Sequence, residues 1–139
     1  MASFNKFNSF VSDLAQKVHN LNSDTIKIML SNTAPAATNT VKSNITEISA
    51  GNGYTAGGVT AAFVSGNDTA GIYKLILSPV SWTASGGLIG PFEYAVLYNS
   101  TPAAGNLIGW WDYGTAITLT NGNTFTVELD QTNGVLTVG

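Results

Sequence analysis

Apolar residues recur at every second position after residue 24, and this period of two constrains the fold most. Residues 25–31 show it clearly, because Ile26, Ile28 and Leu30 fall on one face of an extended chain. Similar segments alternate with clusters of glycine, asparagine and proline, which favour turns. The candidate strands are residues 25–31, 45–48, 59–64, 72–77, 80–83, 92–98, 107–111, 116–120, 124–129 and 135–138. Short strands at this spacing are typical of a sandwich, jelly roll or barrel.

The chain before residue 23 follows a helical period instead. Its apolar residues lie three or four positions apart: Phe4, Phe7, Val11, Leu14, Val18 and Leu21. This pattern predicts an amphipathic helix within residues 1–22, with Ser3 as its N-cap. Such a helix packs either on the sheet of its own subunit or on a neighbouring subunit. We therefore expect one all-β domain over residues 1–139, an antiparallel jelly-roll-like sandwich (residues 23–139) with one N-terminal amphipathic helix.

A β-hairpin is predicted near the end of the chain. Residues 117–120 and 124–129 both alternate between apolar and polar side chains. Asn121, Gly122 and Asn123 between them tolerate positive φ angles, as tight turns require. The two segments are therefore expected to pair with each other.

Composition excludes several classes of function. The 139 residues leave room for one domain, and only 9% of them are charged. The net charge is −3 with no arginine, so a basic surface for nucleic acid is not expected. No apolar run approaches the roughly 18 residues of a membrane span. Without cysteine, disulfides and thiolate metal sites are excluded.

The residues do not suggest catalysis. The single histidine, His19, falls on the polar side of the expected helix, where a solvated surface position is predicted. The carboxylates are scattered, with no spacing like a calcium loop. Residues 51–58 are rich in glycine but lack the Gly-Lys-Ser/Thr ending of a phosphate-binding loop, so we expect a loop with positive φ angles. We predict no enzyme activity and no catalytic, cofactor or metal residues.

The aromatic residues are the most informative candidates. Trp110 and Trp111 are adjacent on an expected strand, so they must point to opposite faces. Both rings lie between two sheets, or one of them faces a neighbouring subunit, or one stacks on a sugar. Tyr94 and Tyr98 raise the same question on another strand. The candidate interface residues are Phe4, Phe7, Val11, Leu14, Tyr94, Tyr98, Trp110 and Trp111.

Several segments resemble a known family. They are residues 4–15, 17–21, 45–48, 51–58, 95–99 and 107–114, of which Asn52-Gly53-Tyr54-Thr55 and Gly109-Trp110-Trp111-Asp112-Tyr113 are the most specific. Together these segments, which span most of the chain, resemble small virion proteins of tailed bacteriophages, and most of all capsid decoration (cement) proteins.

The resemblance implies an architecture and a partner rather than a reaction. It implies a homo-oligomer, with a trimer favoured, that binds the major capsid protein and bridges capsid subunits. The protein would be made in the host cytoplasm and lie on the capsid surface of the virion. A tail-fibre or receptor-binding module that recognises host surface polysaccharide is the alternative, because exposed tryptophan and tyrosine side chains also stack on sugars. Neither reading involves a cofactor, a nucleic acid or a membrane.

Overall fold

The computed structural model describes residues 2–139, of which the secondary structure is 47% strand and 7% helical. The elements are β1 (Ser3–Lys6), α1 (Ser9–Ala15), β2 (Ile26–Ser31), the 3₁₀ helix η1 (Lys42–Asn44), β3 (Val59–Thr60), β4 (Phe63–Thr69), β5 (Ile72–Leu77), β6 (Val80–Thr83), β7 (Ile89–Asn99), β8 (Leu107–Leu119), β9 (Thr124–Val127) and β10 (Leu136–Val138). The predicted all-β character with one α-helix is confirmed.

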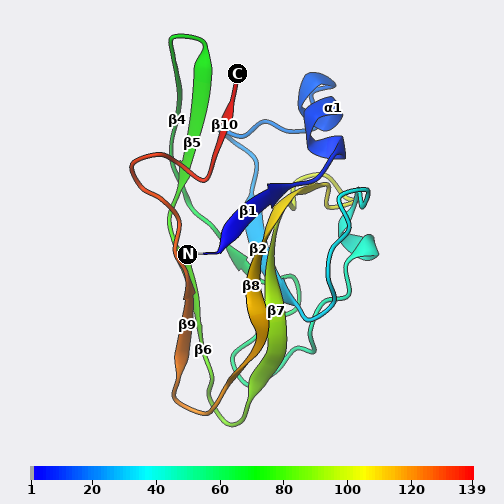
Figure 1. Ribbon diagram of the computed structural model, residues 1–139, viewed down its shortest axis with the longest axis vertical. Helices are drawn as coiled ribbons and strands as arrows, with labels where there is room; N and C mark the ends of the chain where they lie inside the picture. Colours follow the sequence, from blue (N-terminus) through cyan, green and yellow to red (C-terminus); the bar gives the residue numbers. More distant parts are fainter. Residues whose placement is uncertain (1) are drawn as a thin grey trace.

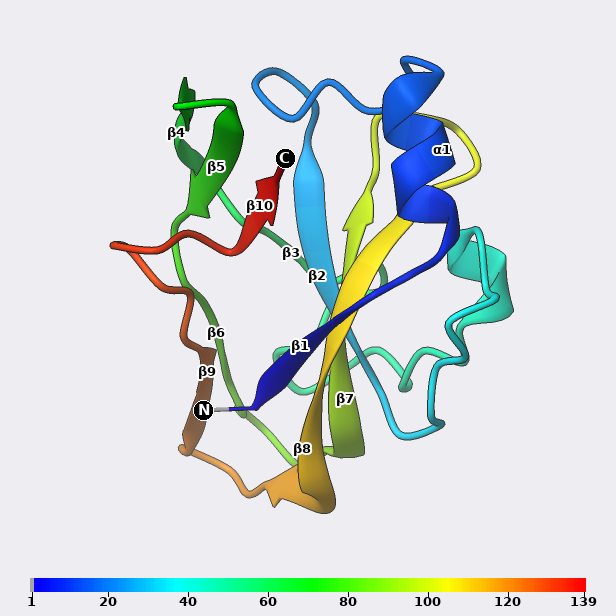
Figure 2. The same ribbon diagram turned by 45° about the horizontal axis from the view of Figure 1, so that its top comes forward.

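The strands form two facing layers. One layer is a five-stranded sheet in the order β1-β8-β7-β2-β3, in which neighbouring strands are antiparallel. The other layer consists of the small sheets β10-β5-β4 and β6-β9, which lie end to end opposite the large sheet (Figures 1 and 2). This arrangement does not confirm the expected jelly roll.

The large sheet buries side chains on both of its faces. Ile26, Ile28 and Leu30 point into the main core between the layers, as their alternation predicts. On the outer face, a second cluster forms under the long connection of residues 32–58. This outer cluster consists of Phe7, Met29, Ile45, Val96, Tyr98 and Leu107, with Trp110 packed against it. A sheet buried on both faces explains why its strands carry few charges.

The prediction of one helix over residues 1–22 is wrong. Residues 3–6 form β1, which pairs with β8, and α1 covers only Ser9–Ala15. Phe10, which the predicted stripe left out, is buried in the main core, whereas Val11 is 55% exposed. The spacing of Phe4 and Phe7 fits a helix, but Phe4 lies in β1 and Phe7 directly after it, and the two rings pack on opposite faces of the sheet, each against a tryptophan.

The predicted hairpin around residues 121–123 is also wrong. β8 pairs with β1 and β7, whereas β9 pairs with β6 in the opposite layer. The turn carries the chain from one layer to the other. Its backbone bonds to Ala84: the Gly122 N–H donates to the Ala84 carbonyl, and the Ala84 N–H donates to the Asn123 carbonyl. Alternation shows that a segment is a strand but not which strand it pairs with.

The other predicted strands are largely confirmed. β5 and β6 begin and end at the predicted residues. Residues 107–111 and 116–119 belong to one long strand, β8. Residues 59–60 form β3, and residues 63–64 begin β4. Residues 45–48 form no named strand, although Glu47 makes an isolated bridge to Ser31.

Candidate functional site

Most of the predicted interface side chains are buried within their own subunit. Phe7, Tyr98, Trp111 and Tyr94 are at most 9% exposed. Phe4, Leu14 and Trp110 are half-buried, and only Val11 is largely exposed. The structure therefore gives the rings of Phe7, Tyr94, Tyr98 and Trp111 an internal packing role.

The two adjacent tryptophans do face opposite sides of the sheet. Trp111 lies in the main core, where its ring centroid is 5.0 Å from that of Phe4. Trp110 lies against the outer cluster, 4.6 Å from the ring of Phe7. Both indoles thus anchor the N-terminal segment, one on each side of β8.

A largely buried hydrogen-bond network holds the glycine-rich loop of residues 51–58 against β2. The Tyr54 hydroxyl accepts from the Leu30 N–H (3.0 Å) and donates to the Glu47 carboxylate (2.6 Å). The same carboxylate oxygen accepts from the Gly57 N–H, and Tyr98 donates to the Gly57 carbonyl, both at 2.6 Å. Burial, and then the bond to Glu47, raise the pKa of Tyr54. Every polar atom named here has a partner, so the network is closed and structural.

The glycines of this loop have the predicted positive φ angles. Gly57 has a φ of +91° and Gly58 a φ of +78°. A Cβ on Gly58 would lie 1.8 Å from the Ile28 carbonyl oxygen, so the loop touches the backbone of β2. Its glycines therefore serve close packing and chain reversal.

His19 is buried, and the prediction of a solvated surface position is wrong. It is 4% exposed, because the chain leaves the helix at Lys17 (φ +66°) and turns back over Phe10. Its Nδ1 lies 3.0 Å from the Asn99 amide nitrogen, and its Nε2 lies 4.0 Å from the Asp13 carboxylate. The periodicity of the sequence could not reveal that His19 is buried, because its burial depends on where the helix ends.

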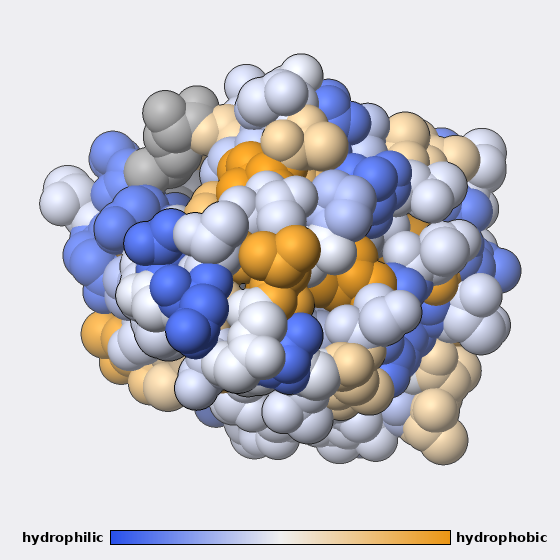
Figure 3. Space-filling model, turned by 90° about the horizontal axis from the view of Figure 1, so that it is seen from below, coloured by the Kyte–Doolittle hydropathy of each residue, from blue (hydrophilic) through white to orange (hydrophobic). Residues whose placement is uncertain are grey.

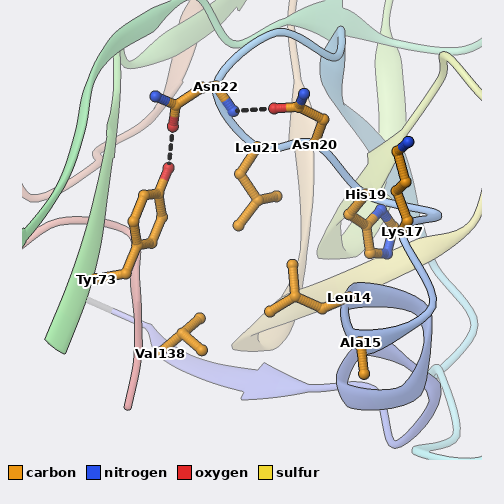
Figure 4. Close-up of a pocket in the computed structure, with 9 residues that line it drawn as sticks. All are labelled: Leu14, Ala15, Lys17, His19, Asn20, Leu21, Asn22, Tyr73 and Val138. Carbon is orange, nitrogen blue, oxygen red and sulfur yellow. Dashed lines mark hydrogen bonds between the residues drawn. The ribbon is translucent and has the colours of Figure 1, made fainter. Parts of the chain in front are cut away.

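A cavity of about 410 Å³ opens beside this turn. Apolar side chains from four elements point into it: Leu14 from α1, Leu21 from the turn, Tyr73 from β5 and Val138 from β10 (Figure 4). Lys17, Asn20 and Asn22 add polar groups, and Asn22 accepts a hydrogen bond from the Tyr73 hydroxyl at 2.5 Å.

Two further cavities continue from this one along β10. The second, of about 280 Å³, touches Leu136 and Thr137, and the third, of about 180 Å³, touches Gly134 and Val135. Successive side chains of a strand alternate between its faces, so cavities that touch every residue from 134 to 138 follow its edge. We call this row of three cavities the seam. β1 and α1 form its other wall, through Ala2, Phe4, Lys6, Phe10 and Leu14.

Apolar side chains also reach the outer surface. The large ones that are most exposed are Val11, Phe63, Val64, Ile72 and Leu88, at 44–55%. Three of them belong to the hairpin of β4 and β5. Seen from below, apolar atoms gather near the centre of a mostly polar surface (Figure 3).

Within residues 2–139, no group of three or more histidine, cysteine or acidic side chains could hold a metal ion. No helix in this range is long and apolar enough to cross a membrane. No protein-family model matches the chain, and no similar curated protein or solved structure was found.

Proposed function

We propose that this protein is a structural component of a bacteriophage virion, a capsid decoration protein that oligomerises and bridges subunits of the major capsid protein on the capsid surface. The proposal assigns the chain no catalytic step, cofactor, nucleic acid or membrane. The segments that resemble decoration proteins carry the family part of the proposal.

The observation that best supports a binding role is the distribution of apolar surface. Tyr54 and Trp111, which belong to the two most specific segments of the resemblance, are buried within the subunit. By contrast, the side chains of Val64, Ile72 and Leu88 are about half exposed. Only 9% of the residues are charged, so little desolvation of charge opposes contact with another protein. A shell presents many identical sites, so modest affinity for each is multiplied when an oligomer engages several of them.

The experiment is a binding assay with capsids that lack the protein. We expect the purified chain to sediment with such capsids at a fixed ratio of copies and to raise the temperature at which they rupture. Tail preparations from the same phage serve as the control and should bind none. If the chain stays at the top of the gradient at every concentration, the decoration role is wrong.

A receptor-binding module for host polysaccharide is the second candidate, and the cavity of Figure 4 is the feature that favours it. Tyr73 offers an aromatic ring there, and Asn20 and Asn22 offer amide groups, as sugar sites often do. The rings of Trp111 and Tyr98, for which sugar stacking is one of the alternatives that the sequence leaves open, are buried. Binding to a glycan array that Asn20→Ala abolishes would favour this candidate over the decoration role.

A further inference from the structure

We propose that Lys27 and Lys42 form a binding site beside Gly57 for a phosphate-type dianion, such as inorganic phosphate or a phosphate monoester. This inference goes beyond the decoration role and does not depend on it. Its parts are two ammonium groups that converge on one point, the absence of a carboxylate in contact with either of them, and a glycine that leaves the point between them open.

The two ammonium groups converge beside the glycine-rich loop. A Cβ on Gly57 would lie 3.5 Å from Lys42 Nζ, 4.0 Å from Lys27 Nζ and 3.3 Å from the Tyr98 hydroxyl oxygen. Gly57 has a φ of +91°, which residues with a side chain rarely adopt, so this position stays open. The chain has five lysines and no arginine, and two of the five lysines meet here although the net charge is −3.

Ordered parts of the fold hold both lysines in place. Lys27 lies on β2, opposite Thr60 of β3 on one side and Tyr98 of β7 on the other. Lys42 begins η1, and its N–H donates to the Gly105 carbonyl at 2.8 Å. Lys42 Nζ lies 5.5 Å from the centroid of the Tyr98 ring, a cation–π contact that orients the side chain. Both lysines are half-buried, so less conformational entropy is lost when a ligand binds them.

No contact within the subunit neutralises these two charges. The one ion pair among residues 2–139 joins His19 and Asp13, so no carboxylate oxygen in this range lies within 4.0 Å of either ammonium group. Lys74 is the only lysine in the same range whose ammonium group donates a hydrogen bond. Each ammonium group carries three N–H donors, so six donors are available to a ligand.

The polar groups around the two lysines are already paired. The carboxylate of Glu47 belongs to the same loop, but its Oε2 accepts from the Gly57 N–H and from the Tyr54 hydroxyl. The Tyr98 hydroxyl donates to the Gly57 carbonyl, so it has no proton left for a ligand. The ammonium groups of the two lysines are therefore the donors of the site.

A dianion matches this pair of charges. Lysine binds phosphate as a point charge and does not need the bidentate geometry of arginine. One phosphate placed against both ammonium groups would balance their charges and offset their mutual repulsion, whereas one carboxylate would balance only one of them. A nucleic-acid backbone distributes its charges along the strand and needs cations at several phosphates, which two lysines do not supply.

A titration of the full chain followed by nuclear magnetic resonance tests the site. Inorganic phosphate is added at about pH 8, where it is mostly a dianion, and sodium chloride of equal ionic strength is the blank. We expect saturable shifts of the amide signals of Lys27, Lys42 and Gly57. Acetate should bind roughly tenfold more weakly, because it carries a single charge.

Matched variants assign the binding to the two lysines. Lys27→Met and Lys42→Met keep an apolar stem and remove the charge, and each should weaken phosphate binding roughly tenfold. Lys6→Met is the control: Lys6 is exposed and lies on β1, which β8 and β7 separate from β2. This variant should bind phosphate as the wild type does. Circular dichroism checks that all three variants fold.

Thermal unfolding provides a second measurement. Phosphate stabilises many proteins without binding to a site, because it is excluded from their surfaces. That general effect should be equal in all variants, whereas stabilisation by binding adds to it only where the site is intact. We therefore expect phosphate to raise the unfolding temperature more for the wild type and Lys6→Met than for Lys27→Met or Lys42→Met.

The possible results have distinct meanings. Shifts that do not saturate, shifts that sodium chloride reproduces, or shifts of the same size in both lysine variants would each overturn the site. Acetate that binds as tightly as phosphate would overturn the assignment to a dianion. Capsid binding is measured separately, so a chain that ignores capsids but binds phosphate would remove only the decoration role.

Discussion

The amide nitrogen of Asn99 lies 3.0 Å from Nδ1 of His19, and this contact selects the tautomer of the buried imidazole. Asn99 uses its oxygen to accept from the Thr101 N–H, so its nitrogen is the donor toward His19. Nδ1 must then accept, and in the neutral ring the proton resides on Nε2. That atom has no hydrogen-bond partner among the described residues. The site therefore suits the neutral histidine.

Stability should consequently fall in mild acid. Burial lowers the pKa of His19 below its ordinary 6.5, against smaller opposing effects of Asp13 and Asp24. The unfolded chain then binds a proton at a higher pH than the folded chain, so the free energy of unfolding decreases as the pH falls below about 6.5. Urea denaturation at about pH 8 and about pH 5 measures the change. The His19→Gln variant has no imidazole to titrate, so between these two pH values it should lose less stability than the wild type. An equal loss in both proteins would contradict the prediction.

Removal of the Tyr54 hydroxyl should destabilise the fold. Tyr54→Phe leaves the buried Leu30 N–H without a partner and removes one of the two hydrogen bonds that the Glu47 carboxylate accepts, which costs about 1–3 kcal/mol. Tyr73→Phe removes a hydroxyl bonded only to Asn22 at the rim of a cavity, and serves as the control with a smaller loss of about 0.5–1.5 kcal/mol. Chemical denaturation of both variants compares them. If both variants lose the same free energy of unfolding, the prediction that the network around Glu47 contributes extra stability is wrong.

Gly58→Ala should be far more harmful than a matched change at an open turn. The new Cβ would lie 1.8 Å from the Ile28 carbonyl oxygen, so the loop must move away from β2. We expect a loss of about 4 kcal/mol or more, or failure to fold. Gly71→Ala has a similar φ of +83° but no atom within 4 Å, so only backbone strain of about 1–2 kcal/mol applies. Thermal unfolding monitored by circular dichroism distinguishes the two.

The two tryptophans should differ in their effect on folding. Trp111→Ala empties a site in the main core and should cost about 3–5 kcal/mol. Trp110→Ala affects a half-buried ring against the outer cluster, and we expect roughly half that loss. If Trp111→Ala instead unfolds at the wild-type temperature and only weakens association, the ring faces a partner and its position in the core is wrong.

Local sequence patterns were sufficient for much of the fold. The alternation of residues 72–77 and 80–83 predicted two strands to the residue, because the period of two depends only on neighbouring side chains. The same rule placed Trp110 and Trp111 on opposite faces. The run of glycines between residues 51 and 58 predicted positive φ angles, since few other residues adopt them.

Only the tertiary structure decided which strands pair and which side chains are covered. β9 joins β6 rather than β8, and residues 3–6 form an edge strand rather than a helix turn, because pairing depends on partners distant in sequence. His19 and Tyr98 are buried by segments that fold back over them. The seam likewise combines residues near both ends of the chain, from Phe4 to Val138, so no local pattern contains it. Periodicity reports the environment of a strand, whereas long-range contacts determine its neighbours.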